Sequence, residues 1–166
     1  MPDHFLHTRK RIHLPNFDYT LPGDYFVTVC AYQKRHIFGQ VVNAEMVFSD
    51  LGAIVNKTWQ EIPNHFPNIL LGAFVVMPNH IHVIIHIHEA TGRGTIYRAP
   101  TDDKTPNFEE FQKPVKGSVS TIIRTFKAAV TRAAGRQHIG LPIWQRNYYE
   151  HIIRTDKEFI EIESYI

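Results

Sequence analysis

Hydrophobic and polar positions along the chain repeat with two different periods, and the shorter period marks the strands. Residues 25–32 form a β-branched and aromatic run, as expected of a central strand. Residues 38–48, punctuated by glycine and asparagine, predict a short hairpin. The apolar run that ends at Met77 leads through a Pro-Asn pair into a strictly alternating segment, so we expect two strands joined by a tight turn.

Helical spacing marks three further segments. The first follows a cap at Ser49 or Asp50 and runs to about residue 65, where a nearby proline closes it. A second begins near Ser118, and a third opens around Thr155 with acidic residues near its positive end. The apolar positions expected on these helices are Leu51, Ile54, Val55, Trp59 and Ile62, then Val119, Ile122, Ile123, Phe126, Val130 and Ala133, then Phe159, Ile160, Ile162 and Ile166.

One more strand or extended segment is expected over residues 143–149. The order strand, helix, strand, strand, helix, strand, helix predicts an α+β fold with a ferredoxin-like antiparallel sheet and helices on one face. With 166 residues, 43% of them hydrophobic, the chain is predicted to be a single domain over residues 1–166. Residues 1–22 predict a basic arm laid across that domain, and residues 89–116 predict either a mobile functional loop or disorder.

The alternating segment carries four histidines on one face of its strand. Because successive strand side chains point to opposite faces, His80, His82, His86 and His88 share a face, and aliphatic residues fill the other. The β-carbons of His80 and His82 should lie about 7 Å apart, which lets both rings converge on one cation. The other two histidines lie about 13 Å or more beyond this pair and are expected to serve something else. A single histidine on a wetted strand face needs no such role, so the metal hypothesis depends on the pair.

Composition narrows the setting of the protein. A formal net charge of +2 is too small to indicate nucleic-acid binding by itself, although eleven histidines add positive charge in acidic surroundings. Cys30 is the only cysteine, which excludes an internal disulfide and favours a reducing compartment. The N-terminus lacks the apolar core of a signal segment, and the longest apolar run, 69–78, is too short to cross a membrane. We therefore expect a cytoplasmic location and no membrane partner.

Cations gather on one side of the helix that begins near Ser118. Arg124, Lys127, Arg132 and Arg136 point away from its apolar arc. Such a face is usually only solvated, and a track for phosphate groups is the alternative. The pattern of the helix leaves both interpretations open.

Several motifs, in this order and at these distances, resemble the IS200-like tyrosine transposases. The resemblance is narrower to the REP-associated tyrosine transposases of the HUH endonuclease superfamily, and it runs over nearly the whole chain. The histidine motif and the Trp-Gln-Arg motif are specific together, whereas either alone would be weak. The matching segments are Arg11-Ile12-His13-Leu14-Pro15, Gly23-Asp24-Tyr25-Phe26-Val27-Thr28-Val29, Ala73-Phe74-Val75-Val76-Met77-Pro78-Asn79-His80-Ile81-His82, Phe126-Lys127 and Trp144-Gln145-Arg146-Asn147-Tyr148-Tyr149.

The resemblance implies a metal-dependent endonuclease that cuts single-stranded DNA. His80 and His82 would hold Mg²⁺ or Mn²⁺, since imidazole ligation favours Mn²⁺ and cellular abundance favours Mg²⁺. Tyr165 matches the tyrosine that attacks DNA in this family and forms a 5′-phosphotyrosine intermediate. The family's Tyr-Ile pair normally precedes Asn-Pro, and here the chain stops at Ile166, so we expect a truncated C-terminus and assign no third metal ligand. The family often carries an acidic residue where this chain has Gly72.

The expected partner is single-stranded or hairpin DNA, held by cations and stacking surfaces. Both a homodimer and a monomer are compatible with the resemblance. The residues expected to contact DNA are Arg9, Lys10, Arg11, Arg124, Lys127, Arg132, Arg146 and Arg154 on the backbone and Trp144, Tyr148 and Tyr149 on the bases.

Two other functions remain open from the sequence. A metal phosphodiesterase could use the histidine pair to activate water, with the tyrosine only structural. A domesticated hairpin-DNA-binding protein without catalysis is the second. Tyr148 and Tyr149 are rival nucleophiles to Tyr165, although aromatic packing or base stacking suits them better.

Overall fold

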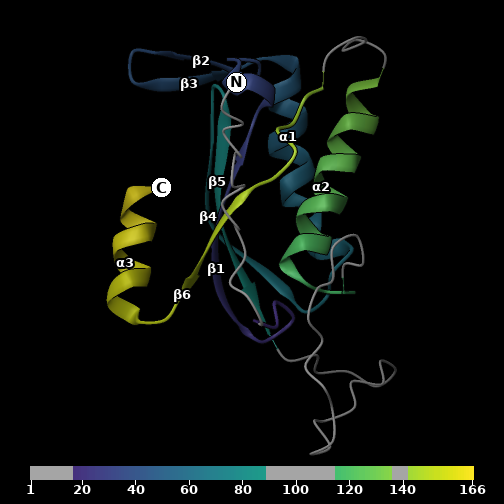
Figure 1. The fold of residues 1–166 in the computed structure, drawn as a ribbon. Helices are drawn as coiled ribbons and strands as arrows, with labels where there is room; N and C mark the ends of the chain where they lie inside the picture. Colours follow the sequence, from purple (N-terminus) through teal and green to yellow (C-terminus); the bar gives the residue numbers. More distant parts are fainter. Residues whose placement is uncertain (1–16, 89–114, 136–141) are drawn as a thin grey trace, which may run out of the picture.

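A four-stranded antiparallel sheet forms the centre of the fold (Figure 1). The computed structural model describes residues 17–88, 115–135 and 142–166, so most of the predicted arm and loop, with Arg9, Lys10, Arg11 and Arg136, lies outside the described residues. The strand order is β4-β5-β1-β6, which is the ferredoxin-like order expected from the sequence. The strands are β1 (Gly23–Cys30), β4 (Ile69–Met77), β5 (His80–Ile87) and β6 (Tyr149–Ile153).

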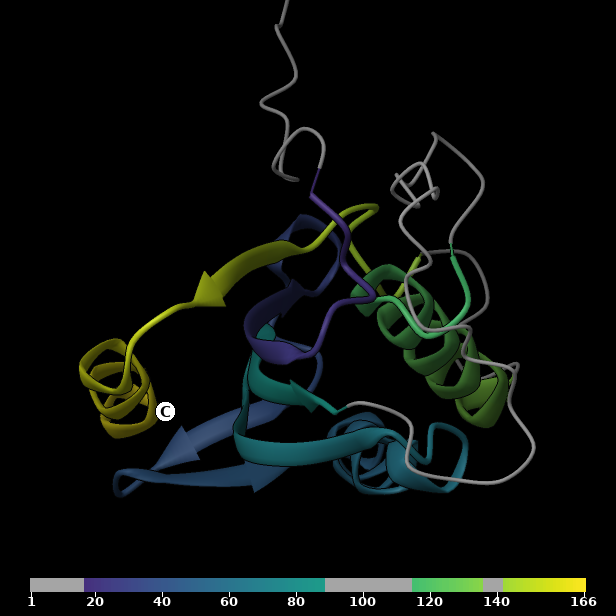
Figure 2. The ribbon, with the colours of Figure 1, turned by 90° about the horizontal axis from the view of Figure 1, so that it is seen from below.

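Two of the three described helices cover one face of the sheet, and the third lies on the opposite face (Figures 1 and 2). The helices are α1 (Asp50–Gln60), α2 (Val119–Ala134) and α3 (Asp156–Tyr165). The expectation of helices on one face therefore holds for α1 and α2 only. A connection of two residues leads from β6 into α3 and directs it to the other side of the sheet. Among the described residues, no helix is long and apolar enough to cross a membrane.

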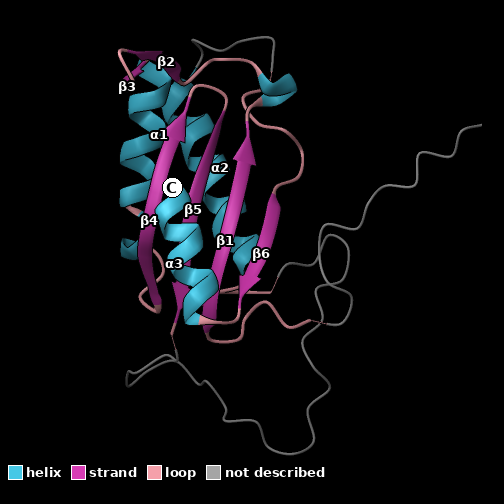
Figure 3. Ribbon diagram, turned by 90° about the vertical axis from the view of Figure 1, so that its left-hand side faces the viewer, coloured by secondary structure: helices cyan, strands magenta, loops and turns pink. Residues whose placement is uncertain are grey.

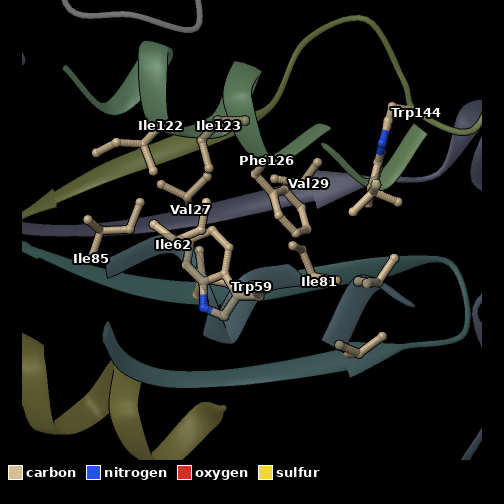
Figure 4. Close-up of a cluster of buried hydrophobic side chains, with 14 of the residues drawn as sticks. Val27, Val29, Trp59, Ile62, Ile81, Ile85, Ile122, Ile123, Phe126 and Trp144 are labelled. Carbon is tan, nitrogen blue, oxygen red and sulfur yellow. The ribbon is translucent and has the colours of Figure 1, made fainter. Parts of the chain in front are cut away.

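The core fills the space between the sheet and the α1–α2 layer (Figure 4). Val27, Ile81 and Ile85 point into it from the strands, because each faces away from the histidine side of the sheet. Trp59 of α1 and Phe126 of α2 meet edge to face at 5.2 Å between ring centroids. This face of the sheet is therefore fully occupied by packing, and a functional site has to lie elsewhere.

The apolar arc predicted for α2 is confirmed except at its last position. Val119, Phe126 and Val130 are buried as expected. Ala134 completes the buried arc, whereas Ala133, which we expected there, is exposed. One step along a helix turns a side chain by about 100°, so an error of one residue moves it off the packed face.

Hydroxyl caps begin each helix where the sequence predicts a start. Ser49 accepts a hydrogen bond from the backbone of the third residue after it, and Ser118 and Thr155 make the same contact. The first helix ends at Gln60, earlier than predicted, and a 3₁₀ turn over Ile62–Asn64 follows it. The proline within that turn cannot donate the hydrogen bond that an α-helix needs.

The last strand of the sheet begins later than predicted. Residues 143–149 were expected to form it, but β6 starts at Tyr149 and ends at Ile153. Trp144 pairs only with Ala31 as an isolated bridge, and its ring packs against Phe38 and Phe126. After this bridge the chain leaves the sheet edge, and the ladder with β1 begins only at Tyr149.

The predicted hairpin is present as β2 (Gly39–Val42) and β3 (Glu45–Phe48). Phe38, directly before β2, contacts the turn that leads into β5. The amide of Phe38 donates to the carbonyl of Pro78 at 3.0 Å. The carbonyl of Phe38 accepts from the amide of Ser49 at 3.0 Å. A β-carbon on Gly52 would lie 1.9 Å from that carbonyl oxygen. This close approach of α1 therefore fixes the position of the turn.

Gly52→Ala should destabilise the protein by about 1–3 kcal/mol, because the new methyl group overlaps the carbonyl of Phe38. Helix propensity alone predicts the opposite sign, a gain of about 1 kcal/mol. Urea unfolding distinguishes the two effects. Gln60→Ala, at an exposed position of the same helix, should change stability by less than about 0.5 kcal/mol. An unchanged or raised stability of the Gly52 variant would show that the turn tolerates displacement.

Candidate functional site

The histidines lie on the face of the sheet that α3 crosses. The register of β1 against β5 places Thr28 opposite His82 and Cys30 opposite His80. Residues opposite one another in an antiparallel pair share a face, so these side chains form one surface. We call this surface, opposite the α1–α2 layer, the histidine face; it consists of His80, His82, Ile84 and His86 of β5 and Asp24, Phe26, Thr28 and Cys30 of β1.

His80 and His82 direct their outer nitrogens toward each other. The two Nε2 atoms are 3.0 Å apart, and the ring centroids are 4.6 Å apart. Asn79 holds the Nδ1 atom of His80 at 2.6 Å, and Thr28 holds that of His82 at 2.8 Å. The ring of Phe26 stacks on His82 with a centroid distance of 5.3 Å. Both rings are therefore fixed in orientation by neighbours on the sheet and the turn.

The partners of Asn79 define the tautomer of His80. The side-chain amide nitrogen of Asn79 donates to the carbonyl of Lys34 at 3.3 Å, which leaves Oδ1 of Asn79 to face His80. A carbonyl oxygen only accepts, so His80 carries its proton on Nδ1 and presents a lone pair on Nε2. The hydroxyl of Thr28 can donate to or accept from Nδ1 of His82. His82 can therefore present either a proton or a lone pair to His80.

Both rings remain neutral at ordinary pH. Burial, with a smaller contribution from the neighbouring His80, lowers the pKa of His82 to about 4. Burial and, to a smaller extent, Lys34 lower the pKa of His80 below its ordinary value. Neutral imidazole is the form that ligates metal ions, so the environment favours the ligating state of both residues.

The pair fits the geometry of two ligands on one ion. Two ligands about 2.1 Å from an octahedral ion and at right angles lie about 3.0 Å apart, which matches the separation of the two Nε2 atoms. The contacts from Asn79 and Thr28 are the outer hydrogen bonds that orient metal-binding histidines. Within residues 17–88, 115–135 and 142–166, no cluster of three or more histidine, cysteine or acidic side chains could surround a metal ion. The described residues therefore offer two ligands here, and other groups, such as water or substrate, would have to supply the rest.

Tyr165 lies beside the histidine pair. Its ring centroid is 5.3 Å from that of His82, and 69% of the residue is exposed. Earlier on α3, Phe159 packs against His86 at 5.7 Å. The helix therefore runs antiparallel to β5 and brings its last turn to the pair. The structure thus assembles His80, His82 and Tyr165, whose catalytic and metal-binding roles stay predictions.

His86, which lies apart from the pair, has partners of its own. Its Nδ1 atom lies 2.7 Å from a carboxylate oxygen of Asp24, and its ring supports Phe159. A β-carbon on Gly72 would lie 2.7 Å from Nε2 of His86, so the glycine leaves room for this ring. Sequence reasoning missed Asp24, although its place in the alternation of β1 put it on the histidine face. His88 is exposed and lies next to His86 with 6.4 Å between ring centroids.

Lys127 does not point into solvent as its place on the helix predicted. Its ammonium group donates to the carbonyls of Gln145 at 2.9 Å and Asn147 at 3.0 Å. Burial lowers the pKa of this amine to about 8. The chain between Trp144 and β6 folds over the helix there and covers the amine, so Lys127 is not a freely solvated cation, and its contact with DNA stays a prediction.

The other predicted DNA-binding residues divide between the two sides of the sheet. Arg124 and Arg132 are exposed on α2, which covers the face opposite the histidines, so the structure does not bring them to the pair. Arg146 and Arg154 are exposed before and after β6. Trp144 is buried and donates its indole N–H to the carbonyl of Lys127. The hydroxyl of Tyr148 pairs with Ser120 of α2, whereas Tyr149 is 51% exposed on the first position of β6.

Thr28 and Asn79 are the site residues that sequence reasoning did not assign. Both contact a histidine Nδ1 atom. The signal for Asn79 was its position directly before the first histidine. The signal for Thr28 was a polar residue within an apolar strand, but its partner follows only from the register of β1 against β5.

The chain is similar to one known protein in sequence and to another in fold. No protein-family model matches the chain. An uncharacterized protein of Haemophilus influenzae is 38% identical over 162 residues, which are 97% of this chain and 87% of that protein. A solved REP-associated tyrosine transposase bound to a REP hairpin matches with a TM-score of 0.59 and 19% identity, over 93% of this chain and 70% of that chain. A Deinococcus radiodurans protein described as a transposase has a TM-score of 0.48 and 14% identity, over 92% of this chain and 95% of that chain.

Stability should decrease as the pH falls from about 6.5 toward 4, in part because of His82. The pKa of this ring is lowered to about 4 in the folded state, whereas in the unfolded chain it is about 6.5. Between these values the unfolded chain binds a proton that the folded chain does not, which favours unfolding. Urea unfolding at several pH values, with His82→Gln beside the unchanged protein, measures the effect. Equal pH slopes for the two proteins would contradict it.

Proposed function

We propose that this chain is a metal-dependent single-strand DNA endonuclease and strand transferase. The premise is that it belongs to the same family as the Haemophilus influenzae protein and has an IS200-like tyrosine transposase fold. One observation supports this function above all others. The ring of Tyr165 lies 5.3 Å from that of His82, on the face where two Nε2 atoms converge. A nucleophile and a ligand pair for a divalent ion are thereby available to one phosphate group.

His80 and His82 would hold Mg²⁺ or Mn²⁺ through their Nε2 atoms. When bound, the ion supplies Lewis acidity that offsets negative charge on the phosphoryl oxygens. Without the ion, one set of tautomers lets every hydrogen bond of the network form. Thr28 donates to Nδ1 of His82, Nε2 of His82 donates to His80, and Nδ1 of His80 donates to Asn79. The hydroxyl oxygen of Thr28 can also accept a hydrogen bond from a protonated Nδ1 of His82, and that tautomer frees the second Nε2 lone pair.

Tyr165 would cut the DNA by direct attack. Its phenolic oxygen forms a bond to phosphorus and loses its proton, while the bond from phosphorus to the 3′ oxygen breaks and that oxygen gains a proton. The products are a 5′-phosphotyrosine and a free 3′-hydroxyl. One phosphoester replaces another, so attack by a 3′-hydroxyl can reverse the reaction and join strands. Exposure of 69% leaves the ring open to a strand that arrives from solvent.

Hairpin DNA with a single-stranded flank is the substrate class that we propose. The transposase of similar fold is described as bound to a REP hairpin. In this chain, the exposed Arg146 and Arg154 lie just before and just after β6 and can neutralise backbone phosphates near this edge of the sheet. Arg124 and Arg132 lie on the opposite layer and could meet only DNA that extends around the molecule.

Incubation with Mn²⁺ and labelled hairpin oligonucleotides that carry randomised single-stranded flanks should yield a covalent protein–DNA adduct on a denaturing gel. Peptide mass spectrometry should locate the DNA on Tyr165. Tyr165→Phe should abolish the adduct and keep hairpin affinity within about twofold, because it removes one oxygen from an exposed ring. Chelation of the metal should abolish the adduct as well.

Two results would contradict the tyrosine mechanism and identify another function. Cleavage of the hairpin without an adduct would indicate attack by water and a metal phosphodiesterase. Hairpin binding without cleavage in Mn²⁺ or Mg²⁺ would indicate a DNA-binding protein without catalysis. An adduct that persists in Tyr165→Phe would move the nucleophile to another tyrosine.

Thr28→Val should weaken Mn²⁺ binding by about 10- to 100-fold, because it removes the hydrogen bond that orients the ring of His82. Valine keeps the shape and strand preference of threonine, so the sheet should remain intact. Thr28→Ser retains the hydroxyl and should recover most of the affinity. Isothermal titration calorimetry measures all three proteins, and equal affinities for valine and threonine would exclude the orienting role.

A further inference from the structure

Tyr149, which the sequence already offered as a residue that contacts bases, lies on the histidine face at the first position of β6. The register of β6 on β1 places Tyr149 opposite Thr28, and the register of β1 on β5 places Thr28 opposite His82. The three side chains therefore form one row across the sheet. With neighbouring strands about 4.8 Å apart, Tyr149 lies about 10 Å from His82 along this row.

The outer end of the row is open to solvent. β6 is an edge strand, and α3 crosses the sheet without covering it (Figure 3). Tyr149 is 51% exposed for this reason. A large aromatic ring in this position presents a π surface beside the site, which bases of any sequence can stack on.

Contacts behind β6 hold the backbone that leads into Tyr149. Lys127 clamps the chain just before the strand through the carbonyls of Gln145 and Asn147. The next residue, Tyr148, is tied to α2 through Ser120 at 2.8 Å. Tyr149 thus follows directly on an anchored segment and pairs with β1 from its first residue. A stacking surface that is already ordered costs a ligand little conformational entropy.

Tyr148, the residue before it, cannot provide this stacking surface. Tyr148 directs its hydroxyl to α2, on the side of the sheet opposite the histidines. Phe48, an exposed aromatic residue at the end of β3, belongs to the separate two-stranded sheet. Arg146 and Arg154 are exposed on either side of β6, so cations accompany the ring of Tyr149.

We propose that Tyr149 stacks on one unpaired base of the DNA strand whose backbone reaches the His80–His82 pair. The role rests on the proposed function and specifies it, since it requires an unpaired nucleotide close to the cut. Stacking on one base positions the strand along the row from Tyr149 through Thr28 to His82. Because every base has a π face, this contact selects for single-strandedness and not for sequence.

The test measures affinity for a hairpin with a single-stranded flank, at constant salt and in a Tyr165→Phe background that prevents adduct formation. Tyr149→Ile should lower the affinity by about fivefold or more, since one lost stack corresponds to about 1 kcal/mol or above. Tyr149→Phe should keep the affinity. Isoleucine favours strands, so β6 should form in the variant. Phe48→Ala, at an exposed aromatic residue of β3, is the matched control and should bind as before.

A scan with abasic nucleotides distinguishes stacking from packing. Each flank nucleotide in turn loses its base, and the affinities of the tyrosine and isoleucine proteins are compared in a double-mutant cycle. At one position the two proteins should bind equally, because the base that Tyr149 contacts is already gone. A Tyr149→Ile effect that is absent, or the same at every abasic position, would overturn the stacking role. If the protein with tyrosine binds no oligonucleotide, the proposed function itself fails and the role with it.

Discussion

The register of β1 against β5 is the constraint on which the site depends. Thr28 faces His82 and Cys30 faces His80 only in this pairing. A slip of one residue would turn both histidines into the core and Ile81 into solvent, which exchanges buried apolar surface for buried imidazole. The aliphatic side of β5 packs against α1 and α2, so the same packing that stabilises the protein keeps the histidines on the open face.

Alternation along β5 was enough to predict the face of the histidines, and hydroxyl caps were enough to predict where the helices begin. Contacts between distant segments decided the rest. Lys127 has the helical position of a solvated cation, yet the later segment that carries Gln145 and Asn147 covers it. Trp144 is a residue type that favours strands, but its ring packs in the core against Phe38 and Phe126. Neither outcome follows from local pattern, because each depends on which segment arrives from elsewhere in the chain.

The two halves of the candidate site differ in how firmly they are held. The histidine pair belongs to a central strand with partners on both sides. In contrast, α3 buries none of its residues fully, and Ile160 on it is 64% exposed. Its hydrogen bonds to the body start at Glu158, which pairs with His151 and accepts from the amide of Arg154. A helix with so little buried surface opens at a lower free energy than the sheet does. The tyrosine is therefore the more adjustable partner.

Because both indoles are buried, tryptophan emission reports folding and not binding at the histidine face. Trp59 and Trp144 are the only tryptophans of the chain, and both contact the ring of Phe126 inside the core. Their emission under selective excitation reports the integrity of this interior, since neither ring is more than 8% exposed. Nucleic acid that approaches the opposite side of the sheet has no indole to quench. The intrinsic fluorescence of the unlabelled protein thus provides a folding probe that stays independent of ligand occupancy.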